Sequence, residues 1–378
     1  MKHIPFHKAY ITEEEINFVV DTIKSGWLTM GQKTIEFEER FKDYIYKDEN
    51  RKGYAISCNS CTAALHLALK AIGLKAGDEV IIPTNTFIAT AEVITYFGAK
   101  PVLCDVEETT HNMDVSKLTE LITNKTKAII PVHFAGQPCD MDDILEIAKK
   151  YNLHVIEDAA HALPSKYNGK MIGTIGDITC FSFYATKTLT TGEGGMATTF
   201  NEEYAKKMKI NRLHGINRDA WDRYTLKGNW YYEVVDNGFK YNTTDINSAL
   251  GLAQIKKLDW MRKRRDEIAN NYTSAFKNTK VIPPIIKKDR ETSWHLYVIK
   301  VNNRDELHKK LKEIGIGTSV HFIPVHKHPY YRYTYRYKDK DYPVANYLYS
   351  HSLSLPIYPD LSEEDIEYVI DNVLKYAK

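Results

Sequence analysis

Lys187 and Asp158 are two residues whose types and positions suit Schiff-base chemistry. Lys187 follows the apolar, β-rich segment 178–184 and precedes a loop that ends in glycines. Burial lowers the pKa of an ammonium group, so a lysine at the end of a buried strand can act as a nucleophile near neutral pH. Asp158 ends a second apolar run, residues 153–157. Pyridoxal phosphate uses such a pair, a lysine for its aldehyde carbon and an aspartate for its ring nitrogen, whereas Lys187 alone would more simply be a surface lysine.

A third feature is segment 57–65, which joins a predicted strand to a predicted helix. Ser60 and Thr62 are residues that cap helices. The free N–H groups of the first helical turn and the helix dipole would then form a site for an anion such as a phosphate monoester. An ordinary N-cap has the same pattern, so this segment indicates a cofactor site only together with Lys187 and Asp158.

Three further residues are candidates for cofactor contacts. Phe87 follows another predicted strand and could stack on a flat pyridine ring, although core packing is the alternative. His161 could approach the ring hydroxyl of the cofactor, or it could be a structural histidine. Ser182 could give a hydroxyl to the phosphate, or it could be a strand residue without such a role.

The elements that must position these residues form an alternating pattern between residues 54 and 200. Short apolar β-type runs alternate with helical patterns there, which predicts an α/β fold with a mostly parallel, seven-stranded sheet between helices. Ligands bind such sheets beyond the carboxyl ends of the strands, where Asp158 and Lys187 fall. The β-type runs are 54–57, 79–82, 101–104, 128–132, 153–157, 178–184 and 195–200.

The remainder of the chain predicts a smaller α+β unit. A charged helical pattern over 245–276 looks like a connector, and Ser362 begins a capping pattern for the last helix. We predict a large cofactor-binding domain at 1–250 and a small C-terminal domain with the connecting helix at 251–378. The other predicted elements of this unit are strands at 294–301 and 318–322 and a helix at 305–314.

Composition narrows the class of protein. A net charge of +2 gives no reason to expect a nucleic-acid or membrane partner. Five cysteines argue against a disulfide framework, and we expect Cys58 and Cys61 to be packed residues rather than a metal or redox site. The N-terminal residues have no apolar core of a signal peptide, and no apolar run approaches the roughly 18 residues of a membrane helix. We therefore expect a cytoplasmic protein without a metal.

In combination, these motifs resemble the DegT/DnrJ/EryC1/StrS family of nucleotide-sugar aminotransferases. That family depends on pyridoxal phosphate and has the fold of the aspartate aminotransferase superfamily, fold type I. The resemblance runs from Ser25 to Pro356. The motifs that carry it are Ser60-Cys61-Thr62-Ala63-Ala64, Thr86-Phe87, Glu157-Asp158-Ala159-Ala160-His161, the segment from Ser182 to Lys187, and Glu193-Gly194-Gly195.

The resemblance implies a role for each of these residues. Lys187 would carry the cofactor and move the proton during catalysis. Asp158 would pair with the pyridine nitrogen, and Phe87 would stack on the ring. The residues implied to surround the phosphate and the ring hydroxyl are Ser60, Cys61, Thr62, Ser182 and His161.

The resemblance also implies that the active sites are shared. Asn242 would reach the cofactor phosphate of a neighbouring subunit, so we expect a homodimer. Cys61 departs from the glycine that the family often has there, which a main-chain N–H contact tolerates unless positive φ is required. A dehydratase branch of the family has histidine in place of the lysine, so Lys187 favours aminotransfer.

The expected substrates are L-glutamate and a nucleotide-linked keto-sugar. Segments 214–224 and 230–232 are rich in arginine and aromatic residues, which suits a uracil ring and a diphosphate as well as it suits a surface loop. Segment 317–322 is similar to members that aminate C4 of UDP-linked sugars. We therefore expect amination of a UDP-4-keto-6-deoxy-N-acetylhexosamine for cell-surface glycan or amino-sugar biosynthesis, with Lys240 and His326 as substrate contacts.

Other readings stay open at this point. The acceptor could be a UDP-4-keto-pentose, GDP-4-keto-6-deoxymannose or a dTDP-3-keto-6-deoxyhexose. A protein of another class, a ligand-sensing relative without catalysis, would share the fold. The presence of both Lys187 and Asp158 favours an enzyme.

Overall fold

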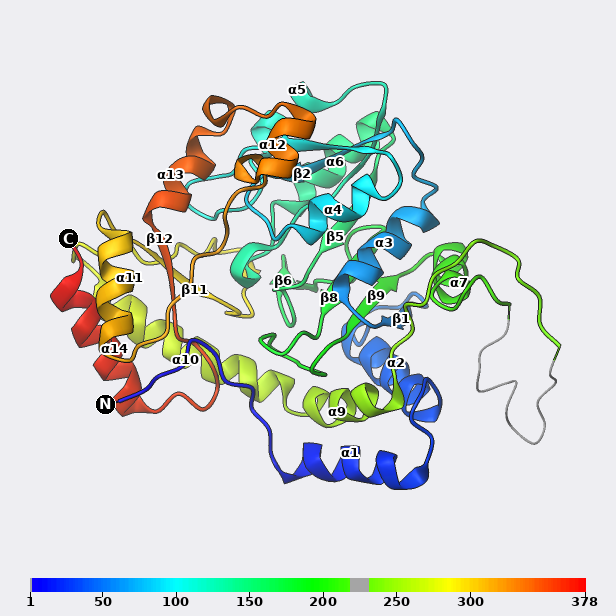
Figure 1. Ribbon diagram of the computed structural model, residues 1–378, viewed down its shortest axis with the longest axis horizontal. Coiled ribbons are helices and arrows are strands. Elements are labelled where there is room, and N and C mark those ends of the chain that lie inside the picture. Colours follow the sequence, from blue (N-terminus) through cyan, green and yellow to red (C-terminus); the bar gives the residue numbers. More distant parts are fainter. Residues whose placement is uncertain (1, 218–230) are drawn as a thin grey trace.

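The computed structural model describes residues 2–217 and 231–378. Its largest element is a seven-stranded sheet in the order β1-β9-β8-β5-β4-β2-β3 (Figure 1). β9 runs antiparallel to both of its neighbours and the other pairs are parallel, so the predicted mostly parallel sheet is confirmed. The strands are β1 (Tyr54–Cys58), β2 (Glu79–Pro83), β3 (Lys100–Cys104), β4 (Thr126–Ile129), β5 (His154–Asp158), β8 (Ile178–Ser182) and β9 (Gly195–Thr199).

Helices cover both faces of this sheet. Ile82 packs in one apolar core and its neighbour Ile81 in another, because successive side chains of a strand point to opposite faces. The first core lies under α3 (Cys61–Ala71), α4 (Ala89–Thr95) and α7 (Glu202–Asn211). The second lies under α2 (Gln32–Ile45) and α6 (Met141–Tyr151). Because the strands are apolar on both faces, they could be recognised as short continuous runs in the sequence.

The predicted connector at 245–276 is two helices, α9 (Asp245–Ile255) and α10 (Leu258–Phe276). At the break, the N–H of Lys257 donates to the carbonyl of Gln254 three residues back rather than four. The Lys257 ammonium reaches Glu15 of α1 (Glu13–Ser25) at 2.6 Å. The chain therefore bends where it is tied to α1.

A third core lies around a two-stranded antiparallel sheet of β11 (Tyr297–Lys300) and β12 (Ser352–Leu355). α10, α11 (Arg304–Glu313) and α14 (Glu363–Tyr376) contribute to it, and the side chain of Ser362 caps α14 as predicted. By contrast, α12 (Pro329–Tyr335) and α13 (Pro343–His351) place Tyr331 and Leu348 in the first core. The domain limits at 250 and 251 stay a prediction.

One predicted strand is wrong. Residues 318–322 form a single bridge, between Ser319 and Ser354, and no ladder. Ser319 and Phe322 line a cavity instead, so these side chains serve a pocket wall rather than a buried sheet face.

The remaining elements are short. Ile4 pairs with Ile316, so the N-terminal segment runs beside residues 315–317 before it reaches α1. Within the described residues, no helix combines the length and apolar character needed to cross a membrane. The short elements are α5 (Leu118–Leu121), the strands β6 (Lys166–Tyr167), β7 (Lys170–Met171) and β10 (Arg290–Glu291), and 3₁₀ turns at Val115–Lys117, Phe134–Gly136, Val325–Lys327 and Asp339–Asp341.

Candidate active site

A cavity of about 530 Å³ lies at the carboxyl ends of β5 and β8. Side chains from the loops after β1 and β2 also line it, as the parallel order of the sheet requires. Residues that the sequence placed far apart therefore meet there. Those among the predicted cofactor-binding residues that line the cavity are Ser60, Cys61, Thr62, Phe87, Asp158, His161, Ser182 and Lys187.

Lys187 lies in a loop that is tied back to β8. The N–H of Lys187 donates to the carbonyl of Tyr184 at 2.9 Å, and Phe183 exchanges main-chain bonds with Thr191 and Gly194 across the loop. The amine Nζ lies 3.5 Å from Nε2 of His295. Burial lowers the pKa of Lys187 to about 8, against the opposing effect of nearby Asp158. A substantial fraction of the amine is thus neutral near pH 8, as a nucleophile or base requires.

Asp158 is the last residue of β5 and is 6% exposed. Its carboxylate accepts hydrogen bonds from Oγ1 of Thr90 at 2.8 Å and from the N–H of Ala160 at 3.1 Å. Burial raises the pKa of Asp158 in spite of these donors and of the Lys187 charge. A buried carboxylate at a cavity wall fits a cationic ligand group such as a protonated pyridine nitrogen.

The N-terminus of α3 forms the part of the wall that suits a phosphate. Oγ of Ser60 caps α3 by accepting the N–H of Ala63 at 3.0 Å. A side chain on Gly195 would come within 2.4 Å of the Ser60 carbonyl carbon, so glycine is required for this loop to approach β9. The first turn of α3 therefore offers free N–H groups to the cavity from a closely packed loop.

Cys61 stands at the first position of α3 and has no positive φ, so its departure from the family's glycine causes no backbone strain. Its Sγ lies 3.6 Å from the carbonyl of Cys180, and burial raises the pKa of the thiol well above its ordinary value. A thiolate is the reactive form of cysteine, so this geometry gives Cys61 a packing role beside the phosphate site.

Phe87 and His161 both face the cavity. Phe87 is 60% exposed, so core packing does not explain it. The Nδ1 atom of His161 accepts the N–H of Ala135 at 3.2 Å, which leaves the hydrogen of the neutral ring on Nε2. Burial lowers the pKa of His161 well below its ordinary value, so the ring is neutral at physiological pH. His161 also stacks on Phe322 with ring centroids 5.8 Å apart.

Several residues of the wall were missed from the sequence. His7 and His295 come from segments without a recognisable motif, and His321 lies in segment 317–322, which was linked to the substrate without a role for this residue. His295 was included in a predicted strand at 294–301, but the strand begins at Tyr297 and His295 lies in the loop before it. Other lining residues lie in motifs or segments noted in the sequence but were given no role of their own: Leu65, Thr86, Ala160, Tyr184, Thr186, Glu193, Gly194, Ser319 and Phe322. The lining residues that were not expected at a site are Phe6, Ala89, Val132, Leu296 and Ile357.

His326 does not fit its predicted role as a substrate contact. It is 0% exposed, and it lies away from the residues that line the cavity. Its Nδ1 is 2.7 Å from Oγ1 of Thr84, and its Nε2 is 3.0 Å from Oδ1 of Asn346. Both ring nitrogens are occupied, so the imidazole holds residues 325–327 against the loop after β2.

Lys240 and Asn242 also lie outside the cavity of their own chain. Lys240 is exposed, and Nδ2 of Asn242 donates to the carbonyl of Thr243 at 3.0 Å. Their predicted roles at a substrate and at a neighbouring subunit's phosphate stay predictions. Most of the predicted nucleotide-binding segment 214–224 and Trp230 lie outside the described residues.

Comparison with known proteins gives a consistent result. The model of the DegT/DnrJ/EryC1/StrS aminotransferase family matches residues 9–374. The spore coat polysaccharide biosynthesis protein SpsC of Bacillus subtilis is 49% identical, over 99% of this chain and 97% of that protein.

Solved structures share the whole fold. Spr1654 of Streptococcus pneumoniae, provisionally named a sugar aminotransferase, is known in PLP and PMP forms. Its PMP form superposes with a TM-score of 0.91 at 35% identity, covering 99% of both chains. PseC of Helicobacter pylori, an aminotransferase of pseudoaminic acid biosynthesis, has a TM-score of 0.91 at 29% identity, over 100% of this chain and 99% of that one.

Proposed function

This chain belongs to the DegT/DnrJ/EryC1/StrS aminotransferase family, and we propose that it transfers the amino group of L-glutamate to the C4 keto group of a nucleotide-linked sugar, with pyridoxal phosphate as cofactor. The observation that carries the proposal is the meeting of Lys187, Asp158 and the N-terminus of α3 in one cavity. A ligand-sensing protein without catalysis would have no use for a lysine with a lowered pKa beside a buried carboxylate.

The residues of the cavity fit this cofactor. The first turn of α3 and Ser182 would hold the phosphate, Asp158 would hold the ring nitrogen, and Phe87 would lie against the ring. When bound, pyridoxal phosphate supplies a conjugated ring that takes up the electron pair left when a bond at the donor's Cα breaks.

Lys187 performs the proton transfers in this proposal. In the donor half-reaction its neutral Nζ would accept the proton that leaves Cα of the amino acid, and in the acceptor half-reaction its ammonium form would deliver a proton to C4 of the sugar. A pKa near 8 suits both steps, because the group exchanges its proton readily near neutral pH. Asp158 would face the ring nitrogen, and a negative charge there would favour the protonated form of that nitrogen.

The choice of acceptor is supported by the relatives. SpsC is named for spore coat polysaccharide biosynthesis, and PseC for pseudoaminic acid biosynthesis. We propose UDP-4-keto-6-deoxy-N-acetylhexosamine as the acceptor. The other acceptors to be compared with it are a UDP-4-keto-pentose, GDP-4-keto-6-deoxymannose and a dTDP-3-keto-6-deoxyhexose.

The proposal includes a homodimer with shared active sites. Asn242 is half-buried and lies outside the cavity of its own chain. This placement leaves it available to a neighbouring subunit.

A half-reaction titration tests the function. The holoenzyme is converted to its pyridoxamine form with L-glutamate, freed of glutamate, and mixed with one keto-sugar at a time. Return of the visible absorbance with UDP-4-keto-6-deoxy-N-acetylglucosamine is the expected result. Return with a different keto-sugar alone would overturn the acceptor, and failure of L-glutamate and other amino acids to bleach the absorbance would overturn the aminotransferase function.

A further inference from the structure

One part of the cavity wall is made of three imidazoles that no cofactor contact explains. We call His7, His295 and His321 the imidazole wall. They come from the N-terminal segment, from the loop before β11 and from the irregular segment before α12. Among the described residues, no group of three or more His, Cys, Asp or Glu side chains is arranged so that it could hold a metal ion.

Behind the imidazole wall lies a buried cation, Arg265 of α10, which is 1% exposed. Its guanidinium donates to the main-chain carbonyls of Trp294 at 3.2 Å and Ile357 at 2.7 Å. Trp294 precedes His295 in the chain, and Ile357 lines the cavity. The guanidinium of Arg265 therefore lies directly behind residues of the cavity wall. Among the described residues, the ion pairs of this part of α10 belong to Arg262 and Arg264 and none belongs to Arg265, whose Nε also has no hydrogen-bond partner.

The guanidinium of Arg265 is thus a buried cation that is held by main-chain carbonyls. Burying an unpaired cation is costly, and an anion bound nearby would offset that cost. The Nδ1 atom of His295 is also buried, and it has no hydrogen-bond partner among the described residues. Burial together with the charges of Lys187 and Arg265 lowers the pKa of His295 well below its ordinary value, and that of His7 to about 4. The rings are neutral at physiological pH, and an approaching anion would favour their protonation.

The position of Lys187 indicates which anion fits. An amino-acid donor must bring its amino group to Nζ of Lys187, and its α-carboxylate is attached to the same carbon as that amino group. The carboxylate therefore has to lie within a few ångströms of Nζ. His295 Nε2 is 3.5 Å from Nζ, whereas the phosphate site at α3 belongs to a different set of elements. Among the described residues that line the cavity there is no arginine to bind a carboxylate directly.

We propose that the imidazole wall binds the α-carboxylate of the amino-acid donor and of its 2-oxo acid product, with the charge of Arg265 behind it. The proposal rests on the proposed aminotransferase function and names the subsite for its donor.

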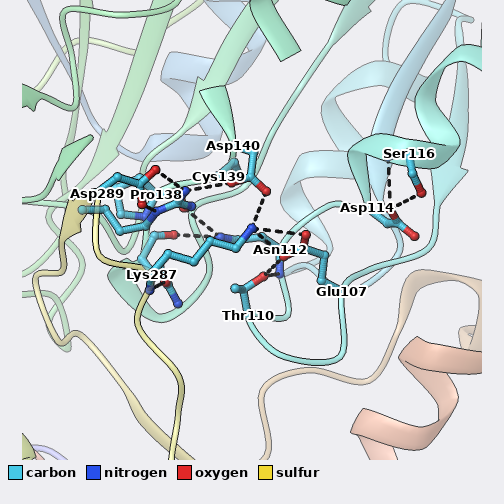
Figure 2. A network of polar contacts seen from close by, with 12 residues as sticks. Glu107, Thr110, Asn112, Asp114, Ser116, Pro138, Cys139, Asp140, Lys287 and Asp289 are labelled. Atoms are coloured by element: carbon cyan, nitrogen blue, oxygen red, sulfur yellow. Dashed lines mark hydrogen bonds and ion pairs between the residues drawn. The ribbon is translucent and has the colours of Figure 1, made fainter. Parts of the chain in front are cut away.

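A polar network fixes the segment that carries His295. Arg290 and Lys287 both bind the carboxylate of Asp140, at 2.8 Å and 2.6 Å, and Lys287 also reaches Glu107 at 3.3 Å (Figure 2). Asn112 donates to the carbonyl of Pro138 at 3.0 Å in the same network. These contacts join residues 287–290 to the loop before α6.

Closer to the cavity, the segment is tied to the loop that orients His161. The N–H of Leu296 donates to the carbonyl of Ala135 at 3.3 Å, and Ala135 in turn donates to His161. The ring of His161 lies against that of His295 with centroids 4.4 Å apart. His295 is therefore held in place before a ligand binds. His7 and His321 have contacts of their own, from Nε2 of His7 to the carbonyl of Ala185 at 3.1 Å and from Nδ1 of His321 to Oγ of Ser354 at 2.8 Å.

The test compares His295→Phe with the control His154→Phe, which removes an imidazole at the amino end of β5, outside the cavity. The half-reactions give apparent affinities for L-glutamate, 2-oxoglutarate and the keto-sugar. We expect His295→Phe to lower the affinity for L-glutamate and for 2-oxoglutarate by roughly 10- to 100-fold, which is the range of a hydrogen bond to a charged group. Cofactor retention and keto-sugar affinity should change less than about 2-fold, and the control should match the wild type. Arg265→Met should also lower the affinity for both acids.

A second comparison tests the chemistry of the contact. Wild-type enzyme should prefer L-glutamate to L-isoglutamine, in which an amide replaces the α-carboxylate, and His295→Phe should lose most of that preference. His295→Gln, which keeps a polar group, should lie between the two proteins. If His295→Phe is unfolded by circular dichroism, the comparison is made with His295→Gln alone.

Three outcomes would overturn the proposal: unchanged affinity for the acids, unchanged preference for L-glutamate, or weakening of the keto-sugar alone. The last would assign the wall to the sugar diphosphate. Failure of the proposed function looks different, because wild-type enzyme would then react with no amino acid. In that case calorimetry of the apoprotein with 2-oxoglutarate still decides the subsite: binding that depends on His295 supports it, and binding that is absent or independent of His295 overturns it.

Discussion

Thr90 donates a hydrogen bond of 2.8 Å from Oγ1 to Oδ2 of Asp158, although 68 residues separate the two in sequence. Oδ1 of Asp158 accepts the N–H of Ala160 at the same time. Both carboxylate oxygens are thus oriented by the protein before any ligand is present. A preorganised carboxylate loses little further freedom on binding a cation, which is a way to gain affinity.

Asp158→Asn should lower both cofactor affinity and turnover. The amide carries no charge to keep the ring nitrogen protonated, and we expect turnover to fall by about 10²-fold or more, the scale of losing one preorganised electrostatic contact. Cofactor titration followed by absorbance and steady-state turnover measure the two effects. Thr90→Val is the matched control and should lower turnover by about 10-fold. Equal turnover in Asp158→Asn and wild type would contradict the assignment.

Lys187→Ala should abolish turnover, by at least about 10³-fold, because the group that moves the proton is lost. Borohydride reduction followed by mass spectrometry should find the cofactor's mass on the peptide that contains Lys187 in the wild type and nowhere in the variant. Labelling of another lysine in the wild type would show that the site has been misassigned.

The rate of cofactor capture by the apoprotein should rise with pH up to about 8 and then level off. Only the neutral amine of Lys187 attacks an aldehyde, and burial lowers its pKa from the ordinary 10.5 to about 8. The neutral fraction therefore grows about tenfold per pH unit below 8 and is nearly complete above 9. Stopped-flow absorbance, recorded over the pH range, gives the dependence of the capture rate on pH. A midpoint near 10.5 would mean that Lys187 is solvated.

Asp245→Ala should destabilise the fold by about 2–4 kcal/mol, since it leaves several buried donors without an acceptor. The carboxylate is 2% exposed and accepts the N–H groups of Gly31, Lys33 and Thr34 at the start of α2. Urea unfolding measures the change. The exposed residue Asp21 gives the control, and Asp21→Ala should stay within about 0.5 kcal/mol of the wild type.

The proposed sharing of active sites between subunits predicts complementation. Lys187→Ala and Asn242→Ala should each be inactive alone, and an equal mixture refolded together should recover about a quarter of wild-type turnover, since half of the dimers are mixed and each carries one intact site. Mixtures that stay inactive while gel filtration shows mixed dimers would contradict the role of Asn242.

The main sheet could be predicted closely because its strands are short apolar runs that helices bury on both faces. β5 was expected at 153–157 and lies at His154–Asp158. β4 was expected at 128–132 but ends at Ile129, and Val132 turns to line the cavity. An apolar run shows that residues are buried and cannot show whether they are buried in a ladder or at a pocket wall.

The meeting of the candidate cofactor residues in one cavity could be predicted because these residues follow strands that end at one edge of the sheet. The imidazole wall could not, because His7, His295 and His321 meet only through tertiary packing of irregular segments. A lone histidine in such a segment carries no local pattern. His326 is a different case, because the resemblance suggested a substrate contact and the side chain is 0% exposed.

The pairing of Ile4 with Ile316 has a practical consequence for handling the protein. It holds the amino-terminal segment in register, so Phe6 and His7 enter the cavity wall. A purification tag or fusion partner joined ahead of Ile4 would lie a few residues from the cavity and would disturb the position of Phe6 and His7 in its wall. The carboxyl-terminal residues follow α14, which contributes nothing to the cavity lining, so that end is the safer attachment point for immobilising an active enzyme.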